Sequence, residues 1–316
     1  MAILTPIEPA DLASFLTEYG IKKYTSYHGV ERGSVNSNFV VEIDGERVFL
    51  RLYEEQTAEG ARRETDLVAW LAAQGIATPA PRARLDGSFV GSLAGKPSAV
   101  FPFVAGEMSC QRGLTVARME AVGEVLARIH RLTPPSLWPS RFGVEELRAR
   151  LDRIAQDPAH GALAGPLRAK LEEAWSRRDP AVPRGLVHGD VFRDNVLWEG
   201  DRLSAILDFE SASEGPFVYD LAVTALAFGY GDGFVPDLVR GLLAGYQDVR
   251  PLVDRERAAL FHEARAAALR FTITRITDYA MRAEAKIAQK DYRRFVGRLA
   301  ELDAMGESGF RDLVGI

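Results

Sequence analysis

The residues with the most chemical information in this chain lie between 186 and 210, in the stretch LVHGDVFRDNVLWEGDRLSAILDFE. Its first half has the form H-x-D-x-x-x-x-N, with Asp190 and Asn195, and a second carboxylate, Asp208, ends the apolar run SAILDF. One carboxylate can orient a hydroxyl group and accept its proton, while an amide and another carboxylate offer the oxygen ligands that Mg²⁺ prefers. Phosphoryl transfer needs this combination, because positioning and charge neutralisation supply most of its catalysis. We therefore expect Asp190 to be catalytic and Asn195 and Asp208 to bind the metal.

The same residues also have structural interpretations. Asp and Asn are common in turns, where they cap the backbone, so any one of the three could be structural by itself. No second His or Cys lies at zinc spacing from His188, so we expect this residue to be structural, with its ring hydrogen-bonded to the backbone near Asp208. For Asp194 and Glu210 the pattern leaves solvated, capping and catalytic roles open.

Length and composition restrict the class of protein. A chain of 316 residues favours two lobes or domains over one core. No segment approaches the roughly 20 apolar residues of a membrane helix, and the first residues lack the basic part of a signal peptide. A single cysteine, Cys110, excludes an internal disulfide, and a net charge of -5 without a long basic run argues against nucleic-acid binding. We expect a cytoplasmic monomer or homodimer that binds small molecules and neither nucleic acid nor membrane.

The residues up to about 105 are expected to form a small sheet crossed by one helix. The runs SNFVVEI and RVFLRLY are separated by DGE, a hairpin signal, and SFVGSLAGKPSAVFPFV contains two more strands joined by a turn around 95–97. Between the two pairs, residues 58–75 have apolar residues at helical spacing and end at a glycine.

After this region the pattern becomes helical. Apolar residues recur at helical spacing from 114 to 132, helical patterns continue from 144 to 178, and long helices resume at Tyr219. The stretch that carries Asp190 interrupts them with two short extended runs. We predict an α+β fold of two lobes, with a strand-rich lobe at residues 1–104 and a mainly helical lobe at residues 105–316.

The motifs in the first stretch resemble a known superfamily. HGDVFRDN followed by ILDFE is similar to the catalytic and metal motifs of the protein-kinase-like small-molecule kinases, which include aminoglycoside phosphotransferases and choline kinases. Three further stretches resemble the homoserine kinase group within it: GVERGSVNSNFVVE, DNVLWEGDRLSAILDF, and AGYQDVRPL with AALRFTITRITD. The resemblance covers nearly the whole chain. One departure, ESASEGPFVYDLA in place of an aromatic, Cys-containing and Asn-Asp stretch, bears on the acceptor and not on the reaction.

The resemblance implies that the first lobe binds ATP and that the second is catalytic and binds the acceptor. In the loop before SNFVVEI, the backbone at Gly33, Ser34 and Asn36 would cover the phosphates. Kinases of this shape place a Lys on the third strand and pair it with a helix Glu. Here Arg51 and Glu64 occupy these positions, and Arg can hold phosphate oxygens through two hydrogen bonds. The loop that contains Gly33 could instead be an ordinary hairpin turn, and Arg51 could instead be a surface arginine.

The segment VFPFVAG, residues 100–106, would be the hinge between the lobes. Its backbone would contact adenine, and Phe101 and Phe103 would form apolar walls, unless these rings belong to the core.

An amino-acid acceptor such as homoserine carries a carboxylate and an ammonium group, so its pocket needs both charges. Arg270, Thr274 and Asp278 recur on one face of a predicted helix, with Arg275 close by, and a solvated, salt-bridged helix would show the same pattern. Arg193, inside the catalytic stretch, could neutralise the transferring phosphoryl group or pair with Asp194.

We therefore expect an ATP- and Mg²⁺-dependent kinase that phosphorylates the hydroxyl of homoserine, a reaction of threonine biosynthesis. The alternatives are a phosphotransferase for another small alcohol (an aminoglycoside, choline or another hydroxy amino acid) and a catalytically inactive relative that binds nucleotide. The catalytic trio argues against the inactive relative, and Arg51 in place of Lys argues slightly for it.

Overall fold

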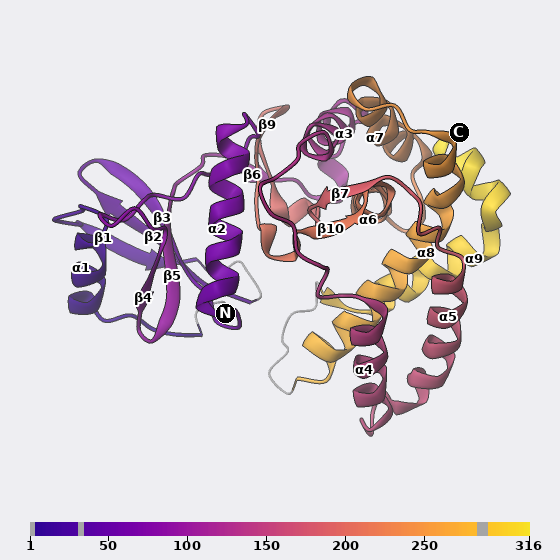
Figure 1. Cartoon of the computed structure of the whole chain (residues 1–316), viewed down its shortest axis with the longest axis horizontal. Helices are drawn as coiled ribbons and strands as arrows, with labels where there is room; N and C mark the ends of the chain where they lie inside the picture. The colour runs from indigo at the N-terminus through magenta and orange to yellow at the C-terminus, as the bar shows by residue number, and fades with distance from the viewer. Residues whose placement is uncertain (1–3, 31–34, 283–289) are drawn as a thin grey trace. The chain divides into compact units, whose positions relative to one another are not determined.

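The computed structural model describes residues 4–30, 35–282 and 290–316 and divides into two compact units (Figure 1). The first unit comprises Met1–Glu107 with Ser204–Glu210, and the second comprises Met108–Leu203 with Ser211–Ile316. Strands and two helices form the first unit and helices dominate the second, so the predicted α+β fold is confirmed.

The predicted single boundary after residue 104 differs from this division. Residues 204–210 return to the first unit, where the Ile206 N–H donates to the Ala77 carbonyl at 2.7 Å and the Ser204 hydroxyl donates to the Ala105 carbonyl at 3.1 Å. Sequence patterns do not reveal such long-range backbone bonds.

The first unit is a five-stranded antiparallel sheet with strand order β1-β2-β3-β5-β4. Its elements are α1 (Pro9–Thr17), β1 (Ser26–Gly29), β2 (Ser37–Ile43), β3 (Glu46–Leu52), α2 (Ala58–Ala73), β4 (Val90–Leu93) and β5 (Lys96–Pro102). Both predicted hairpins and the predicted helix are present.

The two helices cover opposite faces of this sheet (Figure 1). Side chains alternate between faces along a strand, so Leu50 of β3 packs in the core beneath α1, and Tyr53, just after β3, packs with Ala61 of α2. Arg51 therefore faces α2, the helix that carries Glu64.

Both hairpins turn through two residues with positive φ, as type I′ turns require. Asp44 and Gly45 have φ of 40° and 82°, and Ala94 and Gly95 have φ of 51° and 74°. The second turn was predicted around 95–97. It lies one residue earlier, and Lys96 and the following proline already belong to β5.

The second unit contains the longer helices. Its elements are α3 (Val116–His130), α4 (Val144–Ala155), α5 (Ala164–Ser176), β7 (Arg184–Val187), β8 (Val196–Glu199), β10 (Ser213–Pro216), α6 (Phe217–Phe228), α7 (Pro236–Val249), α8 (Asp254–Arg275) and α9 (Arg293–Val314). Two strands extend across the boundaries in sequence, β6 (Glu107–Met108) and β9 (Arg202–Ile206).

Close packing of α3 on α7 depends on glycine. A Cβ at Gly123 would lie 2.2 Å from the Leu242 carbonyl oxygen, and one at Gly245 would lie 2.1 Å from the Glu120 carbonyl oxygen. Helix α3 carries His130 at its end, so this packing also holds His130 in position.

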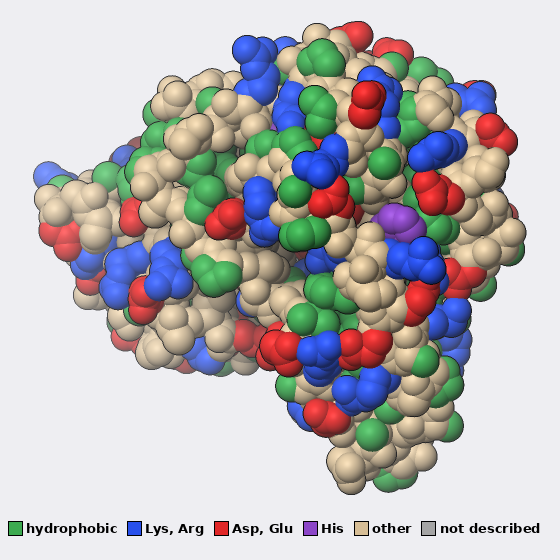
Figure 2. All heavy atoms as spheres, turned by 45° about the vertical axis from the view of Figure 1, so that its right-hand side comes forward, with side chains coloured by type: hydrophobic (Ala, Val, Ile, Leu, Met, Phe, Trp, Pro, Cys, Tyr) green, Lys and Arg blue, Asp and Glu red, His purple; other side chains and the backbone are tan. Residues whose placement is uncertain are grey.

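Among the described residues, no helix has both the length and the apolar character needed to span a bilayer. The face seen in Figure 2 carries acidic and basic side chains interspersed, without a continuous field of one sign.

Candidate active site

The loop at residues 188–195, after β7, is anchored by one buried carboxylate. Asp220, in the first turn of α6, accepts a hydrogen bond from the His188 N–H at 2.6 Å on one oxygen and from the Gly189 N–H at 2.7 Å on the other. The His130 ring lies 3.2 Å from the same carboxylate. Asp220 is fully buried, which raises its pKa, but the hydrogen bond and charge of His130 and the His188 backbone outweigh burial and lower the pKa overall.

This anchoring presents Asp190 and Asn195 side by side. The Asn195 side-chain amide donates to the Asp190 carbonyl at 2.9 Å, so the side-chain oxygen of Asn195 faces elsewhere and is an available ligand. The Asp190 carboxylate remains 29% exposed and lies 3.5 Å from the Arg270 guanidinium. The predicted catalytic base can therefore receive a hydroxyl group. His188 accepts a hydrogen bond from the Asp190 N–H at 3.2 Å, consistent with a structural role.

The loop's charged residues have partners that the sequence did not indicate. Arg193 donates to the Gln111 side chain, and Asp194 accepts instead from Lys290 at 3.1 Å. The alternative that Arg193 pairs with Asp194 is therefore wrong. Lys290 was missed, because a lone lysine nearly 100 residues after the loop carries no local signal.

A second cluster lies in the first unit around Arg51. Its guanidinium lies 3.4 Å from Glu64 of α2, 3.7 Å from Asp208 and 3.8 Å from Glu210. The predicted pairing of Arg51 with Glu64 is present, and Arg51 is no surface arginine, since its side chain is only 14% exposed. Asp208 itself has a φ of 66°, a backbone conformation that is rare outside glycine.

The three carboxylates exceed the charge of the one arginine. Burial raises the pKa of Glu64 well above its usual range, and Glu210 and Asp208 add to this effect by repulsion. Burial also raises the pKa of Glu210, followed by repulsion from Asp208. Burial of Arg51 disfavours its charge, but Asp208 and Glu64 raise its pKa overall.

This cluster has the composition of a divalent-cation site. Oxygen atoms of Glu64, Asp208 and Glu210 all lie within 4.8 Å of one another, and one Glu64 oxygen is buried without a hydrogen-bond partner among the residues that the structure describes. Magnesium prefers carboxylate oxygens, and a cation would offset the surplus negative charge. Sequence analysis left Glu210 open, and its place in the cluster could be found only from the structure.

Of the residues predicted to cover the phosphates, the structure describes only Asn36. Gly33 and Ser34 lie outside the described residues. Asn36, just before β2, uses its side-chain amide to donate to Glu210 and its oxygen to accept from the Glu54 N–H at 3.2 Å. Asn36 thus connects the start of β2 to the carboxylate cluster.

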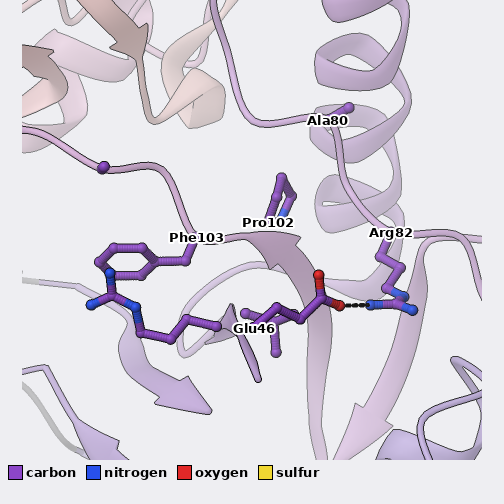
Figure 3. Close-up of a pocket in the computed structure, with 8 residues that line it drawn as sticks. Glu46, Ala80, Arg82, Pro102 and Phe103 are labelled. Atoms are coloured by element: carbon purple, nitrogen blue, oxygen red, sulfur yellow. Dashed lines mark hydrogen bonds and ion pairs between the residues drawn. The ribbon is translucent and has the colours of Figure 1, made fainter. Parts of the chain in front are cut away.

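The two hinge phenylalanines differ. Phe101 is 7% exposed and packs in the core with Tyr53 and Ala61, so it has the core role given as its alternative. Phe103 lines a cavity of about 550 Å³ in the first unit, with Pro102 beside it and Glu46 and Arg82 paired across from it (Figure 3). The Phe103 N–H donates to the Arg47 carbonyl at 3.3 Å, so this backbone donor already has a partner.

The predicted acceptor residues do not form one charged face. Arg270 stacks on Phe142 at 3.8 Å and approaches Asp190. Asp278 lies beyond the end of α8, in a π-helical turn at Ile276–Ala280, and pairs with Arg150 of α4. The i, i+4, i+8 spacing fails because the helix changes pitch after Arg275. A solvated helix is also wrong, since Arg270 and Arg275 are 4% and 7% exposed.

Comparison with known proteins gives a consistent family. The phosphotransferase enzyme family (APH) matches residues 26–261. The chain is 35% identical over 307 residues to a protein named homoserine kinase from Brucella abortus (strain S19), covering 95% of this chain and 94% of the relative. A homoserine kinase from Nitrobacter winogradskyi is 35% identical over 325 residues, covering 99% and 97%.

Solved structures agree at the level of the fold. Spectinomycin phosphotransferase APH(9)-Ia, in complex with ADP and spectinomycin, has a TM-score of 0.72 at 17% identity, covering 96% of this chain and 100% of its own. Amicoumacin kinase hAmiN, in complex with AMP-PNP, Ca²⁺ and Ami, has a TM-score of 0.67 at 14% identity, covering 93% of this chain and 92% of its own. At these identities the likeness concerns the fold alone.

Proposed function

We propose that this chain, which belongs to the phosphotransferase enzyme family, is an ATP-dependent kinase that phosphorylates the side-chain hydroxyl of homoserine. The observation that carries the acceptor is the 35% identity, over 95% of the chain, to a homoserine kinase. The product would be O-phosphohomoserine, and the reaction would be a step of threonine biosynthesis in the cytoplasm.

In the proposed reaction the acceptor oxygen attacks the γ-phosphorus of ATP, and the bond from that phosphorus to the β-bridging oxygen breaks, releasing ADP. Asp190 takes the proton of the acceptor hydroxyl. Its exposed carboxylate and its fixed loop, held by Asp220, support this role. Arg193 is proposed to offset negative charge on the transferring group.

We also propose which residues hold the nucleotide and its metal. Arg51, held by Glu64, would bind phosphate oxygens, and Asp208 with Asn195 would hold Mg²⁺. The bound metal would neutralise phosphate charge. The crowding of carboxylates around Arg51 supports the assignment of Asp208, because the cluster carries more negative than positive charge.

The direct test is ADP formation with Mg²⁺ and ATP against homoserine, threonine, choline and kanamycin. We expect turnover with homoserine and a drop of about 100-fold or more in Asp190→Asn, since general-base catalysis contributes on this order. The matched control is Asp201→Asn, which changes an exposed aspartate on the same unit. Turnover that depends on another acceptor, or an unchanged rate in Asp190→Asn, would contradict the proposal.

A further inference from the structure

Two buried arginines of the second unit contact one aromatic ring close to the catalytic loop. The guanidinium carbon of Arg275, the last residue of α8, lies 4.5 Å from the centroid of the Phe295 ring, and that of Arg298, in α9, lies 4.6 Å from the same centroid. Stacking on an aromatic ring restricts a guanidinium and leaves its N–H donors directed along the edge.

Neither arginine has a carboxylate partner among the residues that the structure describes. Arg275 donates only to the Asp291 carbonyl at 3.4 Å, and Arg298 donates to the Leu226 and Arg294 carbonyls at 2.8 and 2.7 Å. Other buried arginines of this unit differ, since Arg265 pairs with two carboxylates. A guanidinium has five N–H donors, so the two bonds of Arg298 leave capacity for a ligand.

The positive charge at this position is costly without an anion. Arg275 and Arg298 are 7% and 4% exposed. Burial, together with repulsion from the neighbouring cations Arg294 and Arg275, lowers the pKa of Arg298 to about 9. Burial lowers the pKa of Arg275 to about 10 although Asp190 partly counters this effect. A bound anion would offset both the cost of burying these charges and the repulsion between them.

The arginine pair is linked to the catalytic base through Phe192. The Phe192 ring, two residues from Asp190, lies 6.0 Å from the Phe295 ring and 5.6 Å from the Arg275 guanidinium. A ligand that binds both the arginine pair and the base must carry an oxyanion and a hydroxyl group. A hydroxy amino acid has this form.

We propose that Arg275 and Arg298, both stacked on Phe295, form an oxyanion site that binds the carboxylate of the acceptor while its hydroxyl reaches Asp190. This inference rests on the proposed function. Of the acceptor residues expected from the sequence it keeps Arg275, and it puts Arg298 in place of Arg270 and Asp278. Those two residues already bond to Asp190 and Arg150. The recognised class is therefore a small hydroxy acid, with an ammonium group bound elsewhere.

The experiment compares L-homoserine with L-homoserinamide, which has nearly the same shape but lacks the negative charge. In the wild-type protein, kcat/KM should be about tenfold to hundredfold lower for the amide, the loss expected for one charge-assisted pair. Arg275→Gln should raise KM for homoserine by a similar factor, lower kcat/KM for the amide by a clearly smaller factor, and leave KM for ATP unchanged. Arg275→Lys should recover part of the homoserine affinity because it keeps the charge.

Arg265→Gln is the matched control, because it removes another buried, aromatic-contacting arginine that pairs with Glu173 and Asp303 instead. It should lower thermal stability without changing the preference for homoserine. Equal use of homoserine and homoserinamide by the wild-type protein, which needs no variant, would overturn the inference while leaving homoserine kinase activity established.

Two further outcomes separate the alternatives. If Arg275→Gln raises KM for ATP and not for homoserine, the anion is the transferring phosphoryl group, and the inference is wrong. If homoserine is not phosphorylated at all, the proposed function fails. In that case the oxyanion site is tested by calorimetric titration of the wild-type protein and Arg275→Gln with sodium 4-hydroxybutyrate. Binding lost in Arg275→Gln would support the site, and absence of binding to either protein would refute it.

Discussion

At the scale of single residues, Arg51 is the centre of the first unit's site. It lies within 4 Å of three carboxylates, two of which, Glu64 and Asp208, the sequence identified from their positions in the resemblance. The role of the third, Glu210, is ambiguous in sequence because an acidic residue two positions after Asp208 could equally be a capping group. The structure resolves its position through its bond from Asn36 and its distance to Arg51.

Glu210→Gln is expected to stabilise the metal-free protein and to reduce its response to Mg²⁺. Burial and repulsion from Asp208 raise the pKa of Glu210 in the folded protein. At a pH above the pKa that Glu210 has in the unfolded chain, its negative charge therefore lowers the stability of the folded protein. Removing that charge should raise the free energy of unfolding by about 1 kcal/mol. The measurement is urea unfolding without MgCl₂ and with about 10 mM MgCl₂, a concentration that saturates weak carboxylate sites.

The control for this variant is Glu54→Gln. Glu54 is also buried in the first unit, which raises its pKa, but hydrogen bonds from Ser37 and Thr5 and the charge of Lys96 lower the pKa overall. Glu54→Gln should therefore lower stability and leave the Mg²⁺ response intact. A destabilised Glu210→Gln protein with a normal Mg²⁺ response would contradict the account of the cluster.

At the scale of elements, the first turn of α6 determines the shape of the loop at residues 188–195. Each oxygen of Asp220 accepts a backbone N–H of that loop, at 2.6 and 2.7 Å, and the positive end of the helix favours the carboxylate. Asp220 stands in the stretch VYDLA, and the structure shows that its carboxylate holds the backbone of the loop.

Asp220→Asn is expected to lower the free energy of unfolding by about 3 kcal/mol, because one loop N–H would then face a side-chain NH₂ and a buried bond would be lost. The pKa of Asp220 is depressed in the folded protein, so its contribution is complete above its unfolded pKa of about 4 and is lost as pH falls through the folded value. Urea unfolding of wild type and variant from pH 7 down to pH 3 should show a difference that narrows only at the acid end.

Asp237→Asn provides the control, because Asp237 occupies the first turn of α7 but is exposed. Its effect should stay within about 0.5 kcal/mol at every pH. An Asp220→Asn protein as stable as wild type at pH 7 would show that the loop does not depend on this carboxylate.

The elements themselves were largely predictable, and their connections were not. The hairpins and helices follow from period-2 and helical patterns, and DGE predicted a turn whose Asp44 and Gly45 have the required positive φ. The pitch change after Arg275, which directs Asp278 toward Arg150, has no comparable signal. The stacking of Arg275 and Arg298 on Phe295 depends on how α8 meets α9, and the spacing of residues within either helix does not determine this contact.

At the scale of the whole molecule, the chain completes its first unit with a segment from far along the sequence. Residues 204–210 belong to that unit, although the residues before and after them belong to the second. This segment delivers Asp208 and Glu210 to Arg51, so the carboxylate cluster exists only when two distant parts of the chain fold together. The single boundary predicted from the change of texture near residue 104 could not capture this return.

Ile206→Ala should therefore destabilise the first unit, although position 206 lies deep in the second half of the sequence. Ile206 is fully buried, and truncation of a buried isoleucine costs about 2–5 kcal/mol. Native-state hydrogen exchange should accelerate more than tenfold in peptides of α2 and β3, and much less in peptides of α8. Ile154→Ala, at an equally buried isoleucine in α4 of the second unit, should give the reverse pattern.

Two outcomes would contradict this prediction. If both variants accelerate exchange equally in both units, the units unfold as one cooperative body, and residues 204–210 do not stabilise the first unit in particular. If Ile206→Ala affects α8 alone, residues 204–210 do not stabilise the sheet that carries Arg51.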